Sequence, residues 1–386
     1  MNSLEINKKN YKVYTISKQS LFIWTIFLIY LKQKGLSYTQ IMLLNSIGAF
    51  TTFIFEVPTG ILADRFSRKK LLLYGEILKC LNLIIILITN NYYFLMLNAV
   101  LGGIAEAVVS GCGEALIYDC FLENNEEDSY KQYLANINMW ALRFAASATL
   151  LSSLLYKINV DLPMSLSILI QLISILSISR LVDNKLFVEG AFNIKDEFKH
   201  QLDNIKGLIN NKIIIKLFFI YFVMMIIISN LNYTSQAFLP SIGIDTLYLG
   251  VIFFTFNMIS SYGAKHSTKV KLKTKHILII YSILLIGLNF SGMYLSLIIL
   301  CISRYINGMI WPILNSDINS NIKDNRATIL SYKSLFIQIS FIIFDPLIGV
   351  SLDSFGIRHT YALMGIITII SLIIVLLLKK HKQQVI

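Results

Sequence analysis

Long apolar runs without any charged residue dominate the pattern of this chain. Four of them have about the length of one membrane crossing: Gly35–Phe55, Leu162–Ser179, Thr246–Ala264 and Tyr361–Leu378. An α-helix needs about 20 residues to cross the ~30 Å hydrocarbon core of a bilayer. Longer runs, such as Cys80–Ala105, have room for a helix, its turn and the start of the next. The pattern therefore predicts helices that cross a membrane.

We expect twelve such helices and no β-barrel, because no stretch alternates as the strands of a membrane barrel do. The fold class is therefore an all-α membrane protein. The predicted spans are 12–32, 37–63, 70–89, 92–122, 128–156, 161–181, 212–239, 246–265, 276–290, 293–321, 326–352 and 356–379. Residues 1–181 and 212–386 each hold six of them, and 182–211 is the longest polar stretch between.

Composition and charge placement agree with this interpretation. Hydrophobic residues make up 55% of the chain, charged residues 15%, and the mean hydropathy is +0.65, which is too apolar for a soluble protein of this size. The net charge of +12 comes from Lys and Arg in alternate loops, not from a continuous patch that would bind nucleic acid. By the positive-inside rule, both termini and 182–211 are expected in the cytoplasm. Apolar residues at helical spacing within 182–211 predict an amphipathic helix on the membrane surface.

One charged turn between two apolar segments carries the most specific motif. It reads Phe55-Glu-Val-Pro-Thr-Gly-Ile-Leu-Ala-Asp-Arg-Phe-Ser-Arg-Lys-Lys70. This run resembles the loop between the second and third helices of the major facilitator superfamily, with Ser67 where that family usually has glycine. The resemblance implies a secondary transporter with two six-helix bundles.

The same resemblance implies an inner gate built from this loop. Gly60 would allow a close helix approach, Asp64 would meet the helix that begins near Arg326, and Arg65 would pair with Asp119. Arg68 belongs to the same charged group. Two further runs, Ser110–Asp119 and Arg326–Ser331, are similar to a drug-efflux-like bacterial branch of the superfamily. Residues Gly263-Ala264-Lys265 stand where the motif would recur, without its Asp-Arg pair.

Ionisable residues within the predicted spans are candidate functional residues, because they are costly in lipid. Glu106 and Arg143 lie near the middle of two sequential spans, where they would serve as a coupling or substrate site or as a static ion pair. Arg304 and Asp345 lie at comparable depth in the second half, with the order of signs reversed.

Two weaker candidates complete the set. Glu114 lies one to two turns from the end of its span, and Trp311 stands beside Pro312, which can loosen a helix. Glu76 and Lys79 are three residues apart on one helix face, and we expect this pair to be structural.

Other classes of function lack their motifs in the sequence. The chain has no phosphate-binding loop, dinucleotide fingerprint, nucleophile-base-acid set or paired metal-ligand spacing. We therefore expect no enzyme activity, no cofactor and no metal.

The sequence thus predicts a monomeric transporter in the bacterial inner membrane. Its expected partners are a small-molecule substrate, protons and the lipid bilayer. Proton-coupled export of a small apolar or amphiphilic compound by alternating access is the leading interpretation. The alternatives are an uptake permease for a small polar solute and a transport-inactive sensor or immunity partner.

Overall fold

The computed structural model describes residues 3–182, 212–267, 274–321 and 326–380. Within these ranges it describes all side chains except those of Val57, Ile61, Asp64, Arg65, 212–218, 274–275, 315–321, 326–336 and 374–380. All regular secondary structure in the described ranges is helical. The amphipathic helix expected within 182–211 lies outside the described residues.

The chain divides into two compact units, each of which is described by itself. Unit 1 consists of Met1–Leu36, Leu44–Asp196 and Leu249–Val251. Unit 2 consists of Ser37–Leu43, Glu197–Tyr248 and Ile252–Ile386.

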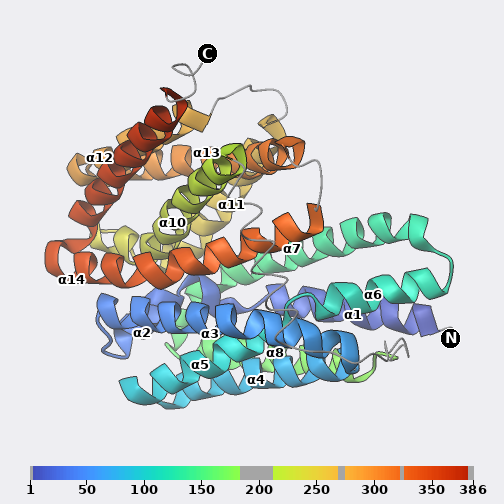
Figure 1. Cartoon of the computed structure of the whole chain (residues 1–386). Helices are drawn as coiled ribbons and strands as arrows, with labels where there is room; N and C mark the ends of the chain where they lie inside the picture. The colour runs from blue at the N-terminus through green and yellow to red at the C-terminus, as the bar shows by residue number, and fades with distance from the viewer. Residues whose placement is uncertain (1–2, 183–211, 268–273, 322–325, 381–386) are drawn as a thin grey trace. The chain divides into compact units, whose positions relative to one another are not determined.

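The helices of the first half run from α1 to α8 in Figure 1, coloured from blue to green. They are α1 (Ser3–Gln19), η1 (Phe22–Thr25), α2 (Phe27–Gln33), α3 (Tyr38–Arg65), α4 (Arg68–Ile88), α5 (Tyr92–Val109), α6 (Cys112–Glu123), α7 (Glu127–Ile158) and α8 (Leu162–Ser179). A buried cluster of side chains from α1, α4, α6, α7 and α8 forms one core of unit 1; it includes Tyr14, Leu72, Ile117, Ile137 and Ile178.

Side chains before two of these helices fix where they begin. Ser67 accepts a hydrogen bond from the backbone N–H of Lys70, and Asn91 accepts from the backbone N–H groups of Tyr93 and Phe94. Such caps satisfy N–H groups that have no partner within the helix. Ser67, which departs from the family motif, therefore starts α4 as an N-cap.

Two predicted spans of the first half are not continuous helices. The span 12–32 is divided among α1, η1 and α2, and the span 92–122 is divided into α5 and α6. At the second break Ser110 ends α5, and Gly111 takes a φ of +76°, in the left-handed region that glycine adopts without strain. The apolar pattern runs through both breaks, so it could not reveal them.

The second half contains α10 (Lys212–Ser241), η2 (Thr246–Tyr248), α11 (Leu249–His266), α12 (Thr274–Phe290), α13 (Met293–Asn321) and α14 (Arg326–Lys380). Helix α14 holds both of the last two predicted spans. Its backbone leaves the helical region at Gly356, where φ is +79°, and the chain turns sharply there (Figure 1).

Helices α11 and α13 of unit 2 approach so closely that only glycine fits at their crossing. A Cβ atom at Gly308 would lie 1.8 Å from the carbonyl oxygen of Ser260, and one at Gly263 would lie 2.0 Å from that of Tyr305. Gly263, the remnant of the repeated motif, thus has a packing role in unit 2.

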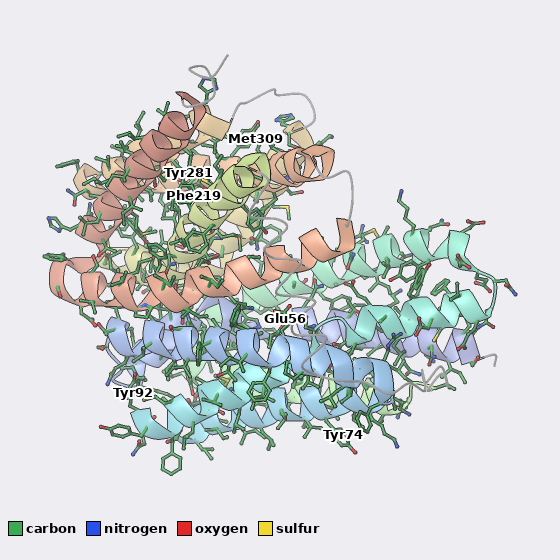
Figure 2. All side chains as sticks on the ribbon, in the orientation of Figure 1. Glu56, Tyr74, Tyr92, Phe219, Tyr281 and Met309 are labelled. Carbon is green, nitrogen blue, oxygen red and sulfur yellow. The ribbon has the colours of Figure 1, made fainter. Side chains whose placement is uncertain are left out.

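Eight helices among the described residues are long and apolar enough to cross a membrane, and α12 is a shorter apolar helix. The exposed surfaces of the two units agree with a lipid environment. In Figure 2, Tyr74 points outward from the helices of unit 1, where 59% of it is exposed, whereas Tyr281 lies among the helices of unit 2. The all-helical membrane fold is confirmed, and the count of twelve crossings stays a prediction.

Candidate functional site

A buried carboxylate in unit 1 is the centre of a polar network that joins four helices. Glu76 on α4 is fully buried. Its Oε1 atom accepts a hydrogen bond of 3.0 Å from the Tyr14 hydroxyl of α1, and its Oε2 atom accepts one from the Gln171 amide of α8. The Lys79 ammonium lies 3.8 Å from Oε1. These donors satisfy a charge that would otherwise be costly to bury.

Lys79 extends the network to a second carboxylate. Its Nζ atom lies 2.7 Å from Oε2 of Glu106 on α5, much closer than it lies to Glu76. The Glu106 side chain is 56% exposed, whereas that of Glu76 is 0% exposed. One ammonium group is therefore shared between a buried and an accessible carboxylate.

The accessible side of Glu106 faces away from the apolar surface of α5. Tyr93, Phe94 and Leu97 are each more than half exposed and mark the lipid-facing side of this helix. Glu106 follows Leu97 by nine residues, which at about 3.6 residues per turn is two and a half turns and hence the opposite face. A charge exposed to lipid is costly, so the position of Glu106 on the face opposite Leu97 agrees with its accessible side facing away from lipid.

Arg143 does not take part in this network. Its guanidinium carbon lies 5.1 Å from the ring centre of Trp140 on the same helix, α7, and within the described part of the chain Arg143 makes no ion pair with Glu106. Depth along the sequence predicts that these two side chains lie level, but the rotation of each helix decides which groups meet. The structure joins Glu106 to Lys79 instead.

Unit 2 holds a buried cation whose described partners are all neutral. Arg304 on α13 is 7% exposed. Its guanidinium donates to the side-chain oxygens of Asn232 and Ser235 on α10, the second bond measuring 3.0 Å. The guanidinium carbon lies 4.9 Å from the ring centre of Phe256 and 5.6 Å from that of Phe253, both on α11. Its Nε–H group has no hydrogen-bond partner among the described residues.

Asp345 on α14, which is 3% exposed, has a separate neutral partner. The side-chain amide of Asn230 donates to its Oδ1 atom at 3.1 Å. Asn230 and Asn232 are two residues apart on α10, so they point to opposite sides of that helix. Arg304 and Asp345 therefore meet different faces of α10 and form no ion pair with each other in the described part of unit 2.

Helix α10 is the element that organises unit 2. On one face, Asn230 bonds Asp345 and Thr234 bonds the Tyr361 hydroxyl at 2.9 Å. On the other face, Asn232 and Ser235 bond Arg304. The spacings of four and three residues place each pair on one side of a helix.

The two weaker candidates of the sequence lie apart from these networks. Trp311 on α13 packs edge-on against Tyr221 of α10, with 5.5 Å between ring centres. It follows Arg304 by seven residues, about two turns, and so lies on the same face of α13. Glu114 is an exposed residue in the first turn of α6, where the helix dipole favours a carboxylate.

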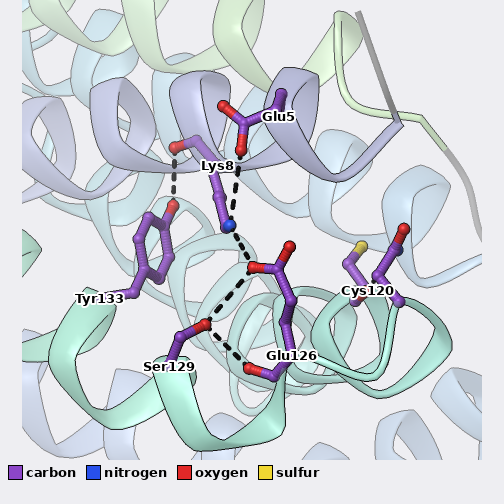
Figure 3. A network of polar contacts seen from close by, with 7 residues as sticks. Glu5, Lys8, Cys120, Glu126, Ser129 and Tyr133 are labelled. Carbon is purple, nitrogen blue, oxygen red and sulfur yellow. Dashed lines mark hydrogen bonds and ion pairs between the residues drawn. The ribbon is translucent and has the colours of Figure 1, made fainter.

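A second polar network joins α1 to the beginning of α7 (Figure 3). The Lys8 ammonium lies 2.7 Å from the Glu126 carboxylate, and the Tyr133 hydroxyl donates to the backbone oxygen of Lys8 at 2.6 Å. Partial burial lowers the pKa of Lys8, but the hydrogen bond and charge of Glu126 outweigh burial and raise it above its usual value.

Comparison with known proteins identifies the family of this chain. The sequence profile of the Major Facilitator Superfamily matches residues 17–344. The chain belongs to the Major Facilitator Superfamily. It is thus a multi-pass membrane transporter and not an enzyme.

Relatives and solved structures agree with this family. The chain is 21% identical over 378 residues to "Uncharacterized MFS-type transporter YxaM" of Bacillus subtilis (strain 168), covering 93% of this chain and 92% of that protein. It has the fold of a mutant of the nucleoside transporter NupG, with a TM-score of 0.79, 14% identity and coverage of 96% and 99%. A bacterial homolog of the human lysosomal transporter Spinster, inward-facing and occupied, gives a TM-score of 0.71 at 13% identity, covering 98% and 96%.

The motif that is expected to form the inner gate is described only in part. The side chains of Asp64, Arg65 and Arg326 lie outside the described residues. Arg68 forms an ion pair with Asp119, which joins the start of α4 to α6. A Cβ atom at Gly60 would meet no described atom within 4 Å, so the close helix approach expected at Gly60 is not found among the described residues.

Sequence reasoning missed the neutral partners that hold the charged groups of this transporter. Gln171 and Tyr14 in unit 1, and Asn230, Asn232 and Ser235 in unit 2, are not among the expected site residues. A signal exists for unit 2, because Asn230-Leu-Asn-Tyr-Thr-Ser-Gln236 is a polar stretch inside an apolar helix. Glu76 and Lys79 are paired as expected, but Lys79 also binds the candidate Glu106.

Proposed function

We propose that this superfamily member couples proton movement to the export of a small amphiphilic compound by alternating access. The observation that carries the proposal is the position of Lys79, which lies 2.7 Å from the accessible carboxylate of Glu106 and 3.8 Å from the buried one of Glu76. Protonation of Glu106 would remove its charge, so Lys79 would form an ion pair with Glu76 alone. Loss of that proton would restore the ion pair between Lys79 and Glu106.

The network supports coupling because it crosses helix boundaries. Glu76 and Lys79 lie on α4, Glu106 on α5, Tyr14 on α1 and Gln171 on α8. A proton bound at Glu106 would therefore weaken the Lys79–Glu106 contact between α4 and α5, while Tyr14 and Gln171 keep Glu76 in place. Such a change gives the proton different affinities for two arrangements of the helices, which is what coupling requires.

Reconstituted vesicles test this proposal. In vesicles with an acidic interior, the outward proton gradient should drive accumulation of a fluorescent amphiphile by the wild type, and Glu106→Gln should reduce this accumulation by roughly tenfold while exchange without a gradient persists. Glu127→Gln, which removes an exposed carboxylate at the start of α7, is the matched control. Unchanged proton-driven accumulation by Glu106→Gln would exclude Glu106 from coupling.

Uptake of a small polar solute is the second candidate function. The polar stretch of α10 and the buried charges of Arg304 and Asp345 favour a substrate with polar groups. Vesicles of known orientation distinguish the two directions, because only an exporter accumulates substrate in inside-out vesicles when the interior is acidic.

The inner gate and the topology belong to the same proposal. Asp64, Arg65, Asp119 and Arg326 would close the cytoplasmic side, and both termini would lie in the cytoplasm of the bacterial cell. Asp64→Asn should impair transport at normal expression. A tag at the C-terminus should remain inaccessible in intact cells, and labelling from outside would refute the orientation.

A further inference from the structure

We infer that Arg304 is the binding residue for the anionic group of the substrate, which would be a small amphiphilic carboxylate. This inference rests on the proposed transport function and names the class of its substrate. It starts from the charges of unit 2, where Arg304 is 7% exposed and Asp345 is bound by Asn230 on the other face of α10.

The guanidinium of Arg304 is held in a fixed orientation, but no described group neutralises its charge. Asn232 and Ser235 accept two of its hydrogen bonds. The rings of Phe253 and Phe256 form cation–π contacts with it. The Tyr281 hydroxyl donates to the backbone oxygen of the preceding residue, Ser303, at 3.0 Å, which anchors this turn of α13. Neutral oxygens and ring faces orient a guanidinium without supplying a counter-ion.

One donor of this guanidinium has no partner among the described residues. The Nε–H group of Arg304 is buried and makes no hydrogen bond. Asn307 also donates to the Asn232 oxygen that accepts from Arg304, at 3.5 Å. A carboxylate is the group that a guanidinium binds best. The Nε–H group is one of the donors that can take part in a bidentate pair of hydrogen bonds to it.

The apolar part of the ligand is inferred from the same face of α13. Trp311 lies about two turns after Arg304, and its ring packs against Tyr221. An anionic head at Arg304 and an aromatic or apolar body toward Trp311 would follow one helix face. The chemistry therefore fits an amphiphilic organic anion better than a neutral or cationic compound.

Binding of benzoate and benzamide to the purified full chain in nanodiscs tests the inference. The two compounds have similar shapes, and only benzoate carries a charge. We expect the wild type to bind benzoate at least about tenfold more tightly than benzamide, measured by thermal stabilisation across a concentration series. Arg304→Gln should remove this preference, and Arg304→Lys should retain part of it. Arg180→Gln, at the exposed end of α8, is the matched control and should leave the preference unchanged.

Three outcomes would overturn the inference. They are equal binding of benzoate and benzamide by the wild type, no stabilisation by benzoate at millimolar concentration, and a preference that survives in a folded Arg304→Gln. If Arg304→Gln does not fold, Arg304→Lys decides, because it keeps the charge but removes the Nε–H donor: a reduced preference supports the site, and a preference equal to that of the wild type opposes it. The assay contains no proton gradient, so its failure leaves the coupling result at Glu106 unaffected, and failure of coupling leaves the binding result unaffected.

Discussion

The ammonium group of Lys79 and the carboxylate of Glu106 are 2.7 Å apart, and this contact joins α4 to α5. Lys79 is also the only described cation within 4.0 Å of the buried Glu76 carboxylate. The behaviour of unit 1 thus depends on how one positive charge is divided between two negative ones.

Replacement of Lys79 by Met should destabilise the protein by about 3 kcal/mol, because it leaves a buried carboxylate without its counter-ion. The second change Glu76→Gln should recover much of the loss, since a neutral amide oxygen still accepts from Tyr14 and needs no cation. Melting temperatures of the two variants and the wild type in the same detergent check this. A double variant less stable than Lys79→Met would show that Lys79 does not serve Glu76.

Replacement of Asn232 by Ala should lower stability by about 2 kcal/mol in the absence of any ligand, because a buried donor that loses its acceptor keeps the cost of its desolvation. Asn232 accepts hydrogen bonds from both Arg304 and Asn307. Asn257→Ala changes an exposed asparagine of α11 and is the matched control. Equal melting temperatures for the two variants would contradict the role assigned to Asn232.

Replacement of Gly308 by Ala should be among the most damaging single changes in unit 2. Its new Cβ atom would lie 1.8 Å from the Ser260 carbonyl oxygen, so α11 and α13 would have to separate, at a cost of about 3 kcal/mol or more. Gly287→Ala on α12 is the comparison, because the nearest atom to its Cβ would lie at 3.5 Å, an ordinary contact. The yield of folded protein and its melting temperature should fall only for Gly308→Ala.

The ion pair between Lys8 and Glu126 should stabilise the contact between α1 and the start of α7 in a pH-dependent way. Because the folded-state pKa of Lys8 is raised above its ordinary value of 10.5, this contribution is complete below about pH 10.5 and is lost as the pH rises through the folded-state value. Hydrogen exchange at the start of α7 should be faster in Lys8→Met than in the wild type at about pH 8. The two should converge at higher pH, and a difference that persists there would contradict the ion pair as its cause.

The helical membrane fold and several of its helices could be predicted closely from the sequence. The span 293–321 coincides with α13, and 276–290 differs from α12 by two residues at its start. Long apolar runs have one physical cause in a membrane protein, so their positions are easily interpreted. The breaks at Leu21–Ile26 and Ser110–Gly111 leave that pattern unchanged, so the sequence does not reveal them.

Charged residues at the candidate sites are easier to predict from the sequence than their partners. Glu106, Arg304 and Asp345 stand out in apolar helices, whereas the residue that each contacts depends on the rotation of the helices about their axes. The pairing of Lys79 with Glu76 follows from their known spacing on one helix. Its shorter contact with Glu106 spans two helices, and no spacing in the sequence encodes it.

The interruption between α5 and α6 places Glu106 and Asp119 on separate helices. The backbone N–H of Ser110 donates to the carbonyl oxygen of Glu106 at 2.9 Å. The last turn of α5 therefore includes Glu106, the candidate for proton binding. Gly111 then allows α6, which carries Asp119, the ion-pair partner of Arg68, to change direction without bending α5. The break at Ser110–Gly111 therefore lets α6, with Asp119, change its direction while Glu106 on α5 keeps its place.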